Sequence, residues 1–372
     1  MKVLMCITDL NKGGAEKMFF YICSKTSFLG YNFEPIVVSF LGGYYEEKLK
    51  SENIKIFTLL KNKNLFRIFK AIFEYICFLF KERTNIHIVH AFMPHGGGLA
   101  LFSNLILKKP YIYAIRNSRY EIINKKNYLS SIFKIFADKL SIKLANLITC
   151  NSDYIKKTFK ESLKEKIIII YNCIEEPTKE MIYDEKIFKN YYYEKDKYYV
   201  TSICNMRYPQ KDIITLLNVA KLLPNLNFVL VGDGESLEYF KKYAYKLDLK
   251  NVCFAGFQEN IYPFLKYANC KILLTRYEGF PNVVLEAMII KCPVIVSDIP
   301  EIRGILIDKQ NAILVKNEAV EQIRDALLLL LNNKELREKI VTNAYNLAIN
   351  NFSLKKMIEN NYTTYIKLLK EN

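Results

Sequence analysis

The feature that most constrains the fold is a regular alternation of short apolar runs, rich in β-branched residues, with longer amphipathic stretches. Such an alternation is typical of parallel sheets covered by helices. The runs in the first half predict strands at Val3–Ile7, Glu34–Ser39, Ile54–Thr58, Ile86–His90, Tyr111–Ile115, Leu147–Cys150 and Ile167–Ile170. Those in the second half predict strands at Tyr199–Ile203, Phe228–Val231, Val252–Phe254, Lys271–Thr275, Val294–Ser297 and Ala312–Val315. Because 372 residues exceed one typical core, we expect two doubly wound α/β domains that face each other across a cleft.

Breaks in this rhythm predict the domain boundaries. Residues 1–175 form the first domain, and the polar, tyrosine-rich stretch 176–198 lacks a buried-strand pattern and is interpreted as a linker. Residues 199–350 form the second domain, and the end of the chain, 351–372, is expected to be a helix that packs back on the first domain. Sheets of this kind bind ligands at the carboxyl ends of their strands, so we expect a site in the loops that follow the strands.

Composition excludes several classes of protein. No window approaches the ~18 uninterrupted apolar residues of a membrane span, and the N-terminus lacks a signal-peptide pattern, so we expect a cytoplasmic chain. Nine cysteines, never spaced C-x-x-C, indicate small buried side chains rather than disulfides or a zinc site. Residues 1–175 carry +13 of the net charge of +16, which indicates either an anionic partner or compositional drift. No helix-turn-helix, zinc-finger or RNP-type pattern accompanies this charge, so nucleic acid is not expected as a partner.

The strongest functional signal is the segment Glu278-Gly-Phe-Pro-Asn-Val-Val-Leu-Glu286. Gly279 permits an unusual turn, Pro281 suits a helix start, and Asn282 can cap the first amides. A helix N-terminus of this kind offers N–H groups and a positive dipole end to a phosphate. Glu286, one turn inside, would accept hydrogen bonds from ribose hydroxyls, whereas Glu278 would lie near the group that the diphosphate carries. The alternative is a capped surface helix with two solvated glutamates.

This segment resembles the E-x7-E motif of glycosyltransferase family 4, retaining enzymes whose GT-B fold has two Rossmann-like domains. Further segments resemble the family in order and interval: Ser202–Lys211, Phe228–Glu235, Val252–Phe257, Lys291–Asp298 and Asn311–Val315. The resemblance covers residues 199–330. It implies a nucleotide-sugar donor that contacts Glu278, Gly279, Phe280, Asn282, Val283 and Glu286.

Two cations, Arg207 and Lys211, follow the first strand of the second domain. A nucleoside diphosphate gains negative charge as the bond to its sugar breaks, and two cations over it stabilise that charge and can replace a metal. The alternative is a pair of solvated surface cations. The resemblance implies that Arg207 and Lys211 hold the donor diphosphate and act with Glu278 in catalysis. No Asp-x-Asp pair occurs in the chain, and we expect neither a metal nor another cofactor.

The first domain resembles the family less closely. Gly13 and Gly14 follow the first strand, where Gly14 is expected at the donor phosphate and Gly13 on the acceptor side; a purely structural turn is the alternative. The loop is not the G-x-G-x-x-G fingerprint of NAD or FAD proteins. His90 resembles a family histidine near the cleft, although a histidine at a strand end can equally be a packing residue. Arg116 and Asn117, placed on the sugar and acceptor side, stand where many family members have a histidine, which argues against a histidine-dependent role there.

Together these features predict a retaining, metal-independent glycosyltransferase. It would move a sugar from an NDP-sugar, expected to be a UDP-sugar, to a glycan or lipid-linked acceptor in bacterial surface polysaccharide synthesis. Two alternatives stay open: a nucleotide-sugar epimerase of the same fold, and a non-catalytic nucleotide-sugar-binding subunit.

The basic first domain is expected to rest peripherally on the anionic, cytoplasmic face of the inner membrane, through charges at Lys61, Lys63, Arg67 and Lys70. The helix expected at 65–83 is interpreted as a core helix that covers the first sheet and has a solvated basic end. Charge, and not insertion, therefore carries this prediction.

Overall fold

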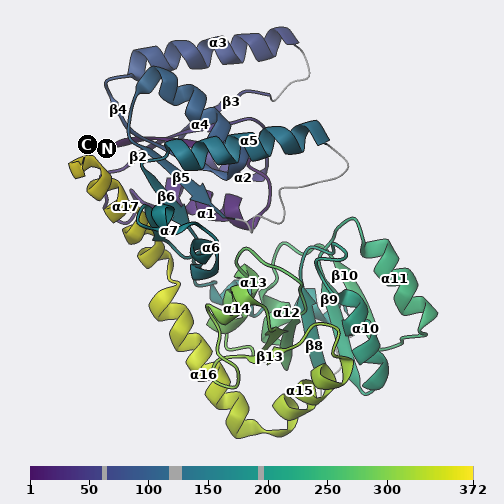
Figure 1. The fold of residues 1–372 in the computed structure, drawn as a ribbon. Coiled ribbons are helices and arrows are strands. Elements are labelled where there is room, and N and C mark those ends of the chain that lie inside the picture. Colours follow the sequence, from purple (N-terminus) through teal and green to yellow (C-terminus); the bar gives the residue numbers. More distant parts are fainter. Residues whose placement is uncertain (61–64, 117–127, 192–196, 372) are drawn as a thin grey trace. The chain divides into compact units, whose positions relative to one another are not determined.

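The computed structural model describes residues 1–60, 65–116, 128–191 and 197–371, which form two compact units (Figure 1). The first unit consists of Met1–Asn172 together with Leu354–Asn372, and the second of Cys173–Ser353. Each unit is built around one parallel sheet. The chain thus leaves the first unit once and returns to it with its last helix.

The sheet of the first unit has seven strands in the order β3-β2-β1-β4-β5-β6-β7. These strands are β1 (Lys2–Ile7), β2 (Glu34–Ser39), β3 (Lys55–Thr58), β4 (Ile86–Phe92), β5 (Tyr111–Ile115), β6 (Leu147–Cys150) and β7 (Ile167–Ile169). The helices are α1 (Gly14–Lys25), α2 (Tyr44–Ser51), α3 (Leu65–Glu82), α4 (Met93–Leu107), α5 (Tyr128–Leu144), α6 (Asp153–Lys157), α7 (Glu161–Lys164) and α17 (Leu354–Glu371). The strand order reverses between β1 and β4, the place where such sheets bind ligands.

The sheet of the second unit has six strands in the order β10-β9-β8-β11-β12-β13. These strands are β8 (Tyr198–Ile203), β9 (Leu226–Val231), β10 (Val252–Gly256), β11 (Cys270–Leu273), β12 (Val294–Ser297) and β13 (Ile313–Val315). The helices are α8 (Lys179–Ile182), α9 (Glu185–Lys189), α10 (Ile213–Leu222), α11 (Leu237–Lys246), α12 (Tyr262–Lys266), α13 (Asn282–Ile289), α14 (Pro300–Arg303), α15 (Val320–Asn332) and α16 (Lys334–Asn351). Here the strand order reverses between β8 and β11.

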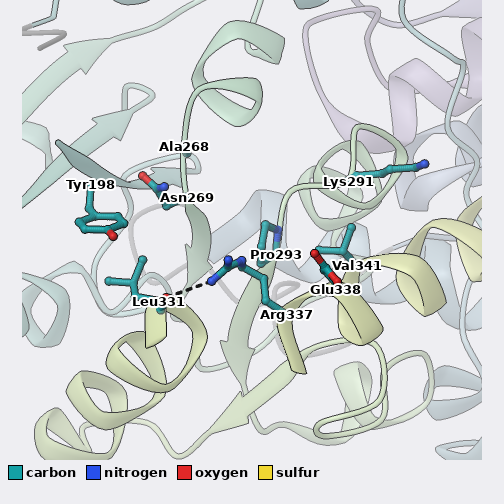
Figure 2. A pocket seen from close by; sticks show the side chains of 9 residues that line it. All are labelled: Tyr198, Ala268, Asn269, Lys291, Pro293, Leu331, Arg337, Glu338 and Val341. Carbon is teal, nitrogen blue, oxygen red and sulfur yellow. Dashed lines mark hydrogen bonds between the residues drawn. The ribbon is translucent and has the colours of Figure 1, made fainter. Parts of the chain in front are cut away.

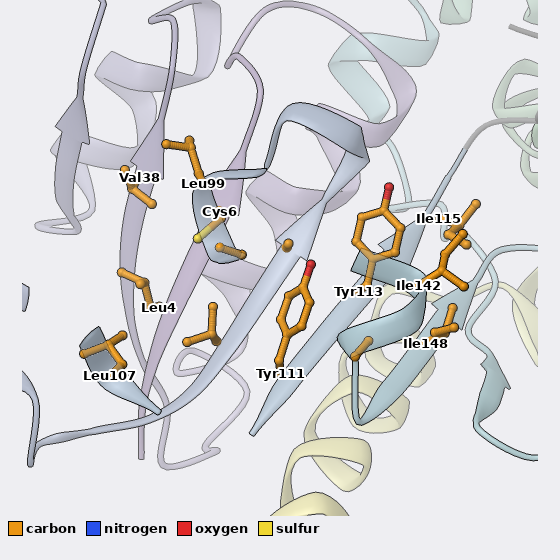
Figure 3. Close-up of a cluster of buried hydrophobic side chains, with 14 of the residues drawn as sticks. Leu4, Cys6, Val38, Leu99, Leu107, Tyr111, Tyr113, Ile115, Ile142 and Ile148 are labelled. Carbon is orange, nitrogen blue, oxygen red and sulfur yellow. The ribbon is translucent and has the colours of Figure 1, made fainter. Parts of the chain in front are cut away.

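A large cluster of buried apolar side chains in the first unit lies on the face of the sheet that α4 covers (Figure 3). Cys6 lies there beside Leu4, and it is one of six buried cysteines, as the apolar runs predict. Two core tyrosines keep a polar partner: the hydroxyl of Tyr113 donates to Oδ1 of Asp138 over 2.7 Å, and the hydroxyl of Tyr75 lies 2.6 Å from Oγ of Ser103. A buried polar atom is costly without such a bond, so these pairs let large tyrosine rings fill the core.

The stretch 176–198, which the sequence predicts to be a linker, has regular structure in the part that is described. It carries α8 and α9 and belongs to the second unit. The ring of Phe188 is buried and lies 5.2 Å from the ring of Tyr199 and 5.8 Å from that of Phe264. An aromatic anchor of this size binds the segment to its neighbours despite its polar composition.

The helix α3 also differs from the prediction. Tyr75, Phe78 and Leu79 are buried and belong to the core of the first unit, as expected for a helix that covers the sheet. Four other phenylalanines of the same helix are exposed. Its apolar residues therefore do not all face the core.

Candidate functional site

The candidate site lies in the second unit, at the carboxyl ends of β8 and β11. The loop 204–212 connects β8 to α10, and the loop 274–281 connects β11 to α13. Because β8 and β11 are the neighbours at which the strand order reverses, these two loops leave the sheet side by side. The fold thus brings together the two segments that the sequence singles out.

Lys211 and Glu278 form an ion pair at this place, although 67 positions separate them in the sequence. Their side chains are only 8% and 12% exposed. The Nζ of Lys211 also lies 3.5 Å from Oγ1 of Thr275. Removing one member of a largely buried pair leaves a charge without its partner, so each side chain fixes the position of the other.

The loop that carries Lys211 runs along the end of β11. The N–H of Asp212 donates to the carbonyl of Leu274 over 3.0 Å, and the N–H of Arg276 donates to the carbonyl of Gln210 over 2.9 Å. The backbone beyond β11 therefore pairs with this loop instead of continuing the parallel ladder. Because of this pairing, β11 ends at Leu273, two residues before the end that the sequence predicts.

Arg207 lies on the same loop, and its side chain is 52% exposed. Its Nε is 3.7 Å from Oε1 of Glu235, an exposed pair that contributes little to stability. The backbone near it is fixed by a close approach: Gly232 has a φ of +132°, and a Cβ there would lie 1.9 Å from the carbonyl oxygen of Cys204. The guanidinium thus reaches solvent from a backbone that cannot easily shift.

The helix α13 begins at Asn282, and Pro281, not Asn282, occupies the cap position. The N–H groups of Asn282 and Val284 donate to the carbonyls of Phe280 and Pro281, over 3.0 and 2.9 Å. Two of the first N–H groups of α13 are therefore bonded to carbonyls of the preceding turn. The sequence predicts instead that the side chain of Asn282 caps them. Glu286 lies in the second turn and is buried.

The remaining residues of the motif differ in exposure. Gly279 and Val283 are half-buried, and Phe280 is buried, with its ring 5.7 Å from that of Phe352. Phe280 is thus bound to the end of α16 and fixes the turn before α13. The predicted contacts of these residues with a donor stay predictions.

Glu301, at the start of α14, is a site residue that the sequence interpretation missed. It is buried and lies near Glu278. Burial raises the pKa of Glu301, and the nearby Glu278 carboxylate adds to the shift. The sequence does carry a signal, since Pro300-Glu301 follows β12 directly and begins a helix at the carboxyl edge of the sheet.

In the first unit, Gly13 and Gly14 lie between β1 and α1 as predicted. Gly13 is the cap residue of α1 in extended conformation, and Gly14 is the first helical residue and is exposed. The carboxylate of Glu16 folds back toward Gly13, so that a Cβ on Gly13 would lie 2.1 Å from Oε2. Burial raises the pKa of Glu16 to about 7. The roles of both glycines toward donor and acceptor stay predictions.

His90 and Arg116 lie at the carboxyl ends of β4 and β5, and both are buried. The Nδ1 of His90 is 2.8 Å from the hydroxyl of Tyr365 on α17, and burial holds the pKa of His90 well below its usual value. Arg116 donates from NH1 to the carbonyl of Ile170 over 3.0 Å. These positions favour the packing role that the sequence left open for His90. Asn117 lies outside the described residues.

A cavity of about 340 Å³ opens at the other edge of the second sheet, near the amino ends of β8, β11 and β12 (Figure 2). Arg337, which lines it, donates to the carbonyl of Leu331 over 3.0 Å. The Nζ of Lys291 lies 4.7 Å from the ring centre of Tyr345. Both cations are thus engaged within the fold, and the cavity lies away from the strand ends at which such sheets bind ligands.

Two protein-family models match the chain: Glycosyltransferase Family 4 over residues 12–176, and Glycosyl transferases group 1 over residues 184–347. A glycosyltransferase of Methanocaldococcus jannaschii is 28% identical over 266 residues, which are 70% of each chain. The UDP-Gal:alpha-D-GlcNAc-diphosphoundecaprenol alpha-1,3-galactosyltransferase of Escherichia coli is 24% identical over 327 residues, 84% of this chain and 83% of that protein.

Similar folds occur among solved structures. HepE of Anabaena in complex with UDP is 17% identical and superposes with a TM-score of 0.80 over 99% of this chain and 100% of that one. A structural similarity at 17% sequence identity is evidence for a shared fold only.

Proposed function

The chain belongs to glycosyltransferase family 4 and has the GT-B fold, and we propose that it is a retaining, metal-independent enzyme that uses a UDP-sugar as donor. The observation that carries this proposal is the Lys211–Glu278 ion pair beside Arg207, at the point where the strand order of the second sheet reverses. Lys211 and Glu278 hold each other there before any ligand arrives, and Arg207 extends to solvent from the same loop as Lys211.

The two cations suit the charge that develops on the leaving group. As the bond between sugar and diphosphate breaks, negative charge gathers on the phosphate oxygens. Arg207 presents a planar guanidinium to solvent, which can donate two parallel hydrogen bonds to phosphate. Lys211 supplies a second positive charge four residues further on, held by Glu278. Because Lys211 is held in advance and Arg207 extends from a loop with a fixed backbone, the two cations can stabilise the leaving group without a metal.

The carboxylates have different tasks in this proposal. Glu286, inside α13, accepts hydrogen bonds from the ribose hydroxyls of the nucleotide. Glu278, before the helix, lies toward the sugar, where its negative charge favours the positive charge that forms at the anomeric carbon. The acceptor oxygen attacks on the face that the diphosphate leaves, and its proton passes to a phosphate oxygen. The new glycosidic bond therefore keeps the anomeric configuration of the donor.

The relatives suggest the class of substrate. The Escherichia coli galactosyltransferase is named for a UDP-sugar donor and a diphosphoundecaprenol acceptor, and the Anabaena protein binds UDP. We therefore propose that this chain transfers sugar from UDP to a glycan or lipid-linked acceptor in bacterial surface glycan synthesis. It would work peripherally, on the cytoplasmic face of the inner membrane.

The test is a panel of nucleotide sugars, read by nucleotide release and by NMR of the product. We expect release of UDP, and a product with the anomeric configuration of the donor. A productive donor at 100 times its Kd should also stabilise the protein by ~2.7 kcal/mol. Inversion of the configuration would refute retention. Binding without release of nucleotide, or epimerisation of the donor without transfer, would refute the transferase.

A further inference from the structure

The helix α3 has two apolar faces. Its buried residues pack on the core of the first unit, where the ring of Phe57 lies 5.4 Å from that of Tyr75 and 4.7 Å from that of Phe78. Its exposed residues are four phenylalanines, each more than half exposed: Phe66 (77%), Phe69 (68%), Phe73 (67%) and Phe80 (60%). We call these four residues the phenylalanine stripe.

The spacing of the stripe places it on one side of the helix. Steps of three, four and seven residues return to the same side at 3.6 residues per turn. The exposed Cys77 falls on the same side, one turn beyond Phe73. Tyr75 and Leu79, two residues after Phe73 and Cys77, project to the opposite side, which is buried. The stripe is thus a continuous outward face and not the rim of the core.

The neighbouring helix α4 also exposes large apolar side chains. The helix α4 lies beside α3 (Figure 1). The hydroxyl of Tyr75, on the buried side of α3, is 2.6 Å from Oγ of Ser103. On either side of Ser103, α4 exposes Phe102 (41%) and Leu105 (76%). Soluble proteins rarely leave so many large apolar side chains together in water without a partner for them.

Cations flank the stripe. Arg67, Lys70 and Lys81 are exposed on α3, and the exposed Arg83 follows its last turn. Glu74 offsets part of this charge, since it lies 3.9 Å from Lys70. Residues 1–175 as a whole carry a net charge of +13. A second copy of the chain would bring the same cations against these, so charge disfavours self-association through α3 and favours an anionic partner.

Aromatic side chains with cations beside them on the surface of a helix are what an interfacial helix presents to an anionic bilayer. No helix in the described part of the chain is long and apolar enough to cross a membrane. We propose that α3 lies flat in the surface of an anionic lipid bilayer, with the phenylalanine stripe inserted and its cations at the level of the lipid phosphates. This inference rests on the proposed function only for its purpose, which is to bring the enzyme to a lipid-linked acceptor.

The first test is binding of the full chain to vesicles of phosphatidylcholine with and without phosphatidylglycerol. We expect sedimentation with the anionic vesicles only. Changing all four residues of the stripe to serine should weaken binding at least ~100-fold, since each phenylalanine adds buried apolar area. A matched control changes four exposed aromatic residues elsewhere, and it should bind as the unaltered protein does: Phe28, Tyr239, Tyr245 and Phe257.

A second test reports insertion directly. The chain contains no tryptophan, so Phe73→Trp places a single tryptophan in the stripe, whose emission can be excited selectively. Its emission should shift to the blue with anionic vesicles, whereas that of Tyr245→Trp should not. No shift for Phe73→Trp, or equal binding by the stripe variant, would overturn the proposal. The proposal would also be overturned if the unaltered protein formed a dimer without vesicles and the stripe variant did not. A second copy of the chain would then be the partner of α3.

Nucleotide release by the same variants, without vesicles, separates the two proposals. The stripe variant should release nucleotide at the normal rate in solution. Normal release with no vesicle binding by the unaltered protein would overturn the membrane inference alone. Vesicle binding with no nucleotide release from any donor would overturn the proposed function alone.

Discussion

Replacing Glu16 by glutamine should stabilise the protein above neutral pH and leave its stability unchanged in mild acid. Glu16 lies in the first turn of α1, is 9% exposed, and folds its carboxylate back toward Gly13. Burial raises the pKa of Glu16 from 4.5 to about 7, and the negative charge of Asp9 adds to this shift. A carboxylate with such a pKa is held in a place that disfavours its charge.

The size of the change in the free energy of unfolding follows from the difference in proton binding between the folded and the unfolded chain. Between pH 4.5 and about 7 the folded protein keeps a proton on Glu16 that the unfolded chain has released, so the free energy of unfolding falls as the pH rises through this window. A shift of ~2.5 pKa units at ~1.4 kcal/mol each amounts to a loss of ~3 kcal/mol, complete near pH 8. Glutamine has nearly the same shape and no charge, so Glu16→Gln avoids this loss.

Urea unfolding at a series of pH values from 4 to 8, followed by circular dichroism, measures the effect. The difference in free energy of unfolding between Glu16→Gln and the unaltered protein should grow from near zero at pH 4 to ~3 kcal/mol at pH 8. Glu52→Gln, a change of an exposed glutamate after α2, is the matched control and should show no such trend. A difference that stays constant with pH, or a less stable Glu16→Gln at pH 8, would refute the reasoning.

Three further predictions concern the second unit. Glu286→Gln should mainly weaken nucleotide binding, measured by calorimetry, whereas Glu278→Gln should mainly lower kcat, with a smaller loss of affinity because Lys211 loses its partner; loss of affinity alone in both would contradict the roles given to them. Full transfer activity is expected in excess EDTA, and activity that EDTA abolishes and Mg²⁺ or Mn²⁺ restores would contradict the metal-independent mechanism. Gly232→Ala should destabilise the unit by more than ~2 kcal/mol in urea, because its φ is +132° and its Cβ would meet the carbonyl of Cys204. Gly256→Ala, with a φ of +64° and open space around its Cβ, carries only the backbone strain and should lose less; equal losses would contradict the close approach.

The parallel sheets could be predicted from sequence because their strands are short apolar runs with polar ends. The strands β2, β5, β6 and β12 have the predicted bounds, and the other strands differ by a few residues at their ends. The order of the loops along a doubly wound sheet then places the segments near 207 and 278 at neighbouring strand ends. The spacing of the apolar runs thus predicts the fold and the place of the candidate site.

Side-chain partners could not be predicted in this way, because they depend on contacts between distant segments. Spacing predicts that Lys211 and Glu278 lie near a donor, but not that they bind each other. Nothing in the sequence around His90 shows that its partner is Tyr365, 275 positions later. The helix α3 is apolar on two sides, and the sequence does not show which side the sheet covers.

The most direct test of the donor site is the rate of transfer by Arg207→Ala and Lys211→Ala. Both changes remove a proposed charge-assisted contact with the leaving diphosphate, so kcat/KM should fall by about 100-fold or more. Arg207 is half exposed and its backbone is fixed by neighbouring segments, so Arg207→Ala should keep the circular dichroism and melting temperature of the unaltered protein. Lys242→Ala, a change of an exposed lysine on α11, is the control and should keep full activity. A fall in kcat/KM confined to Arg207→Ala and Lys211→Ala is the result we predict, and near-normal turnover by both would contradict the assignment of the donor site.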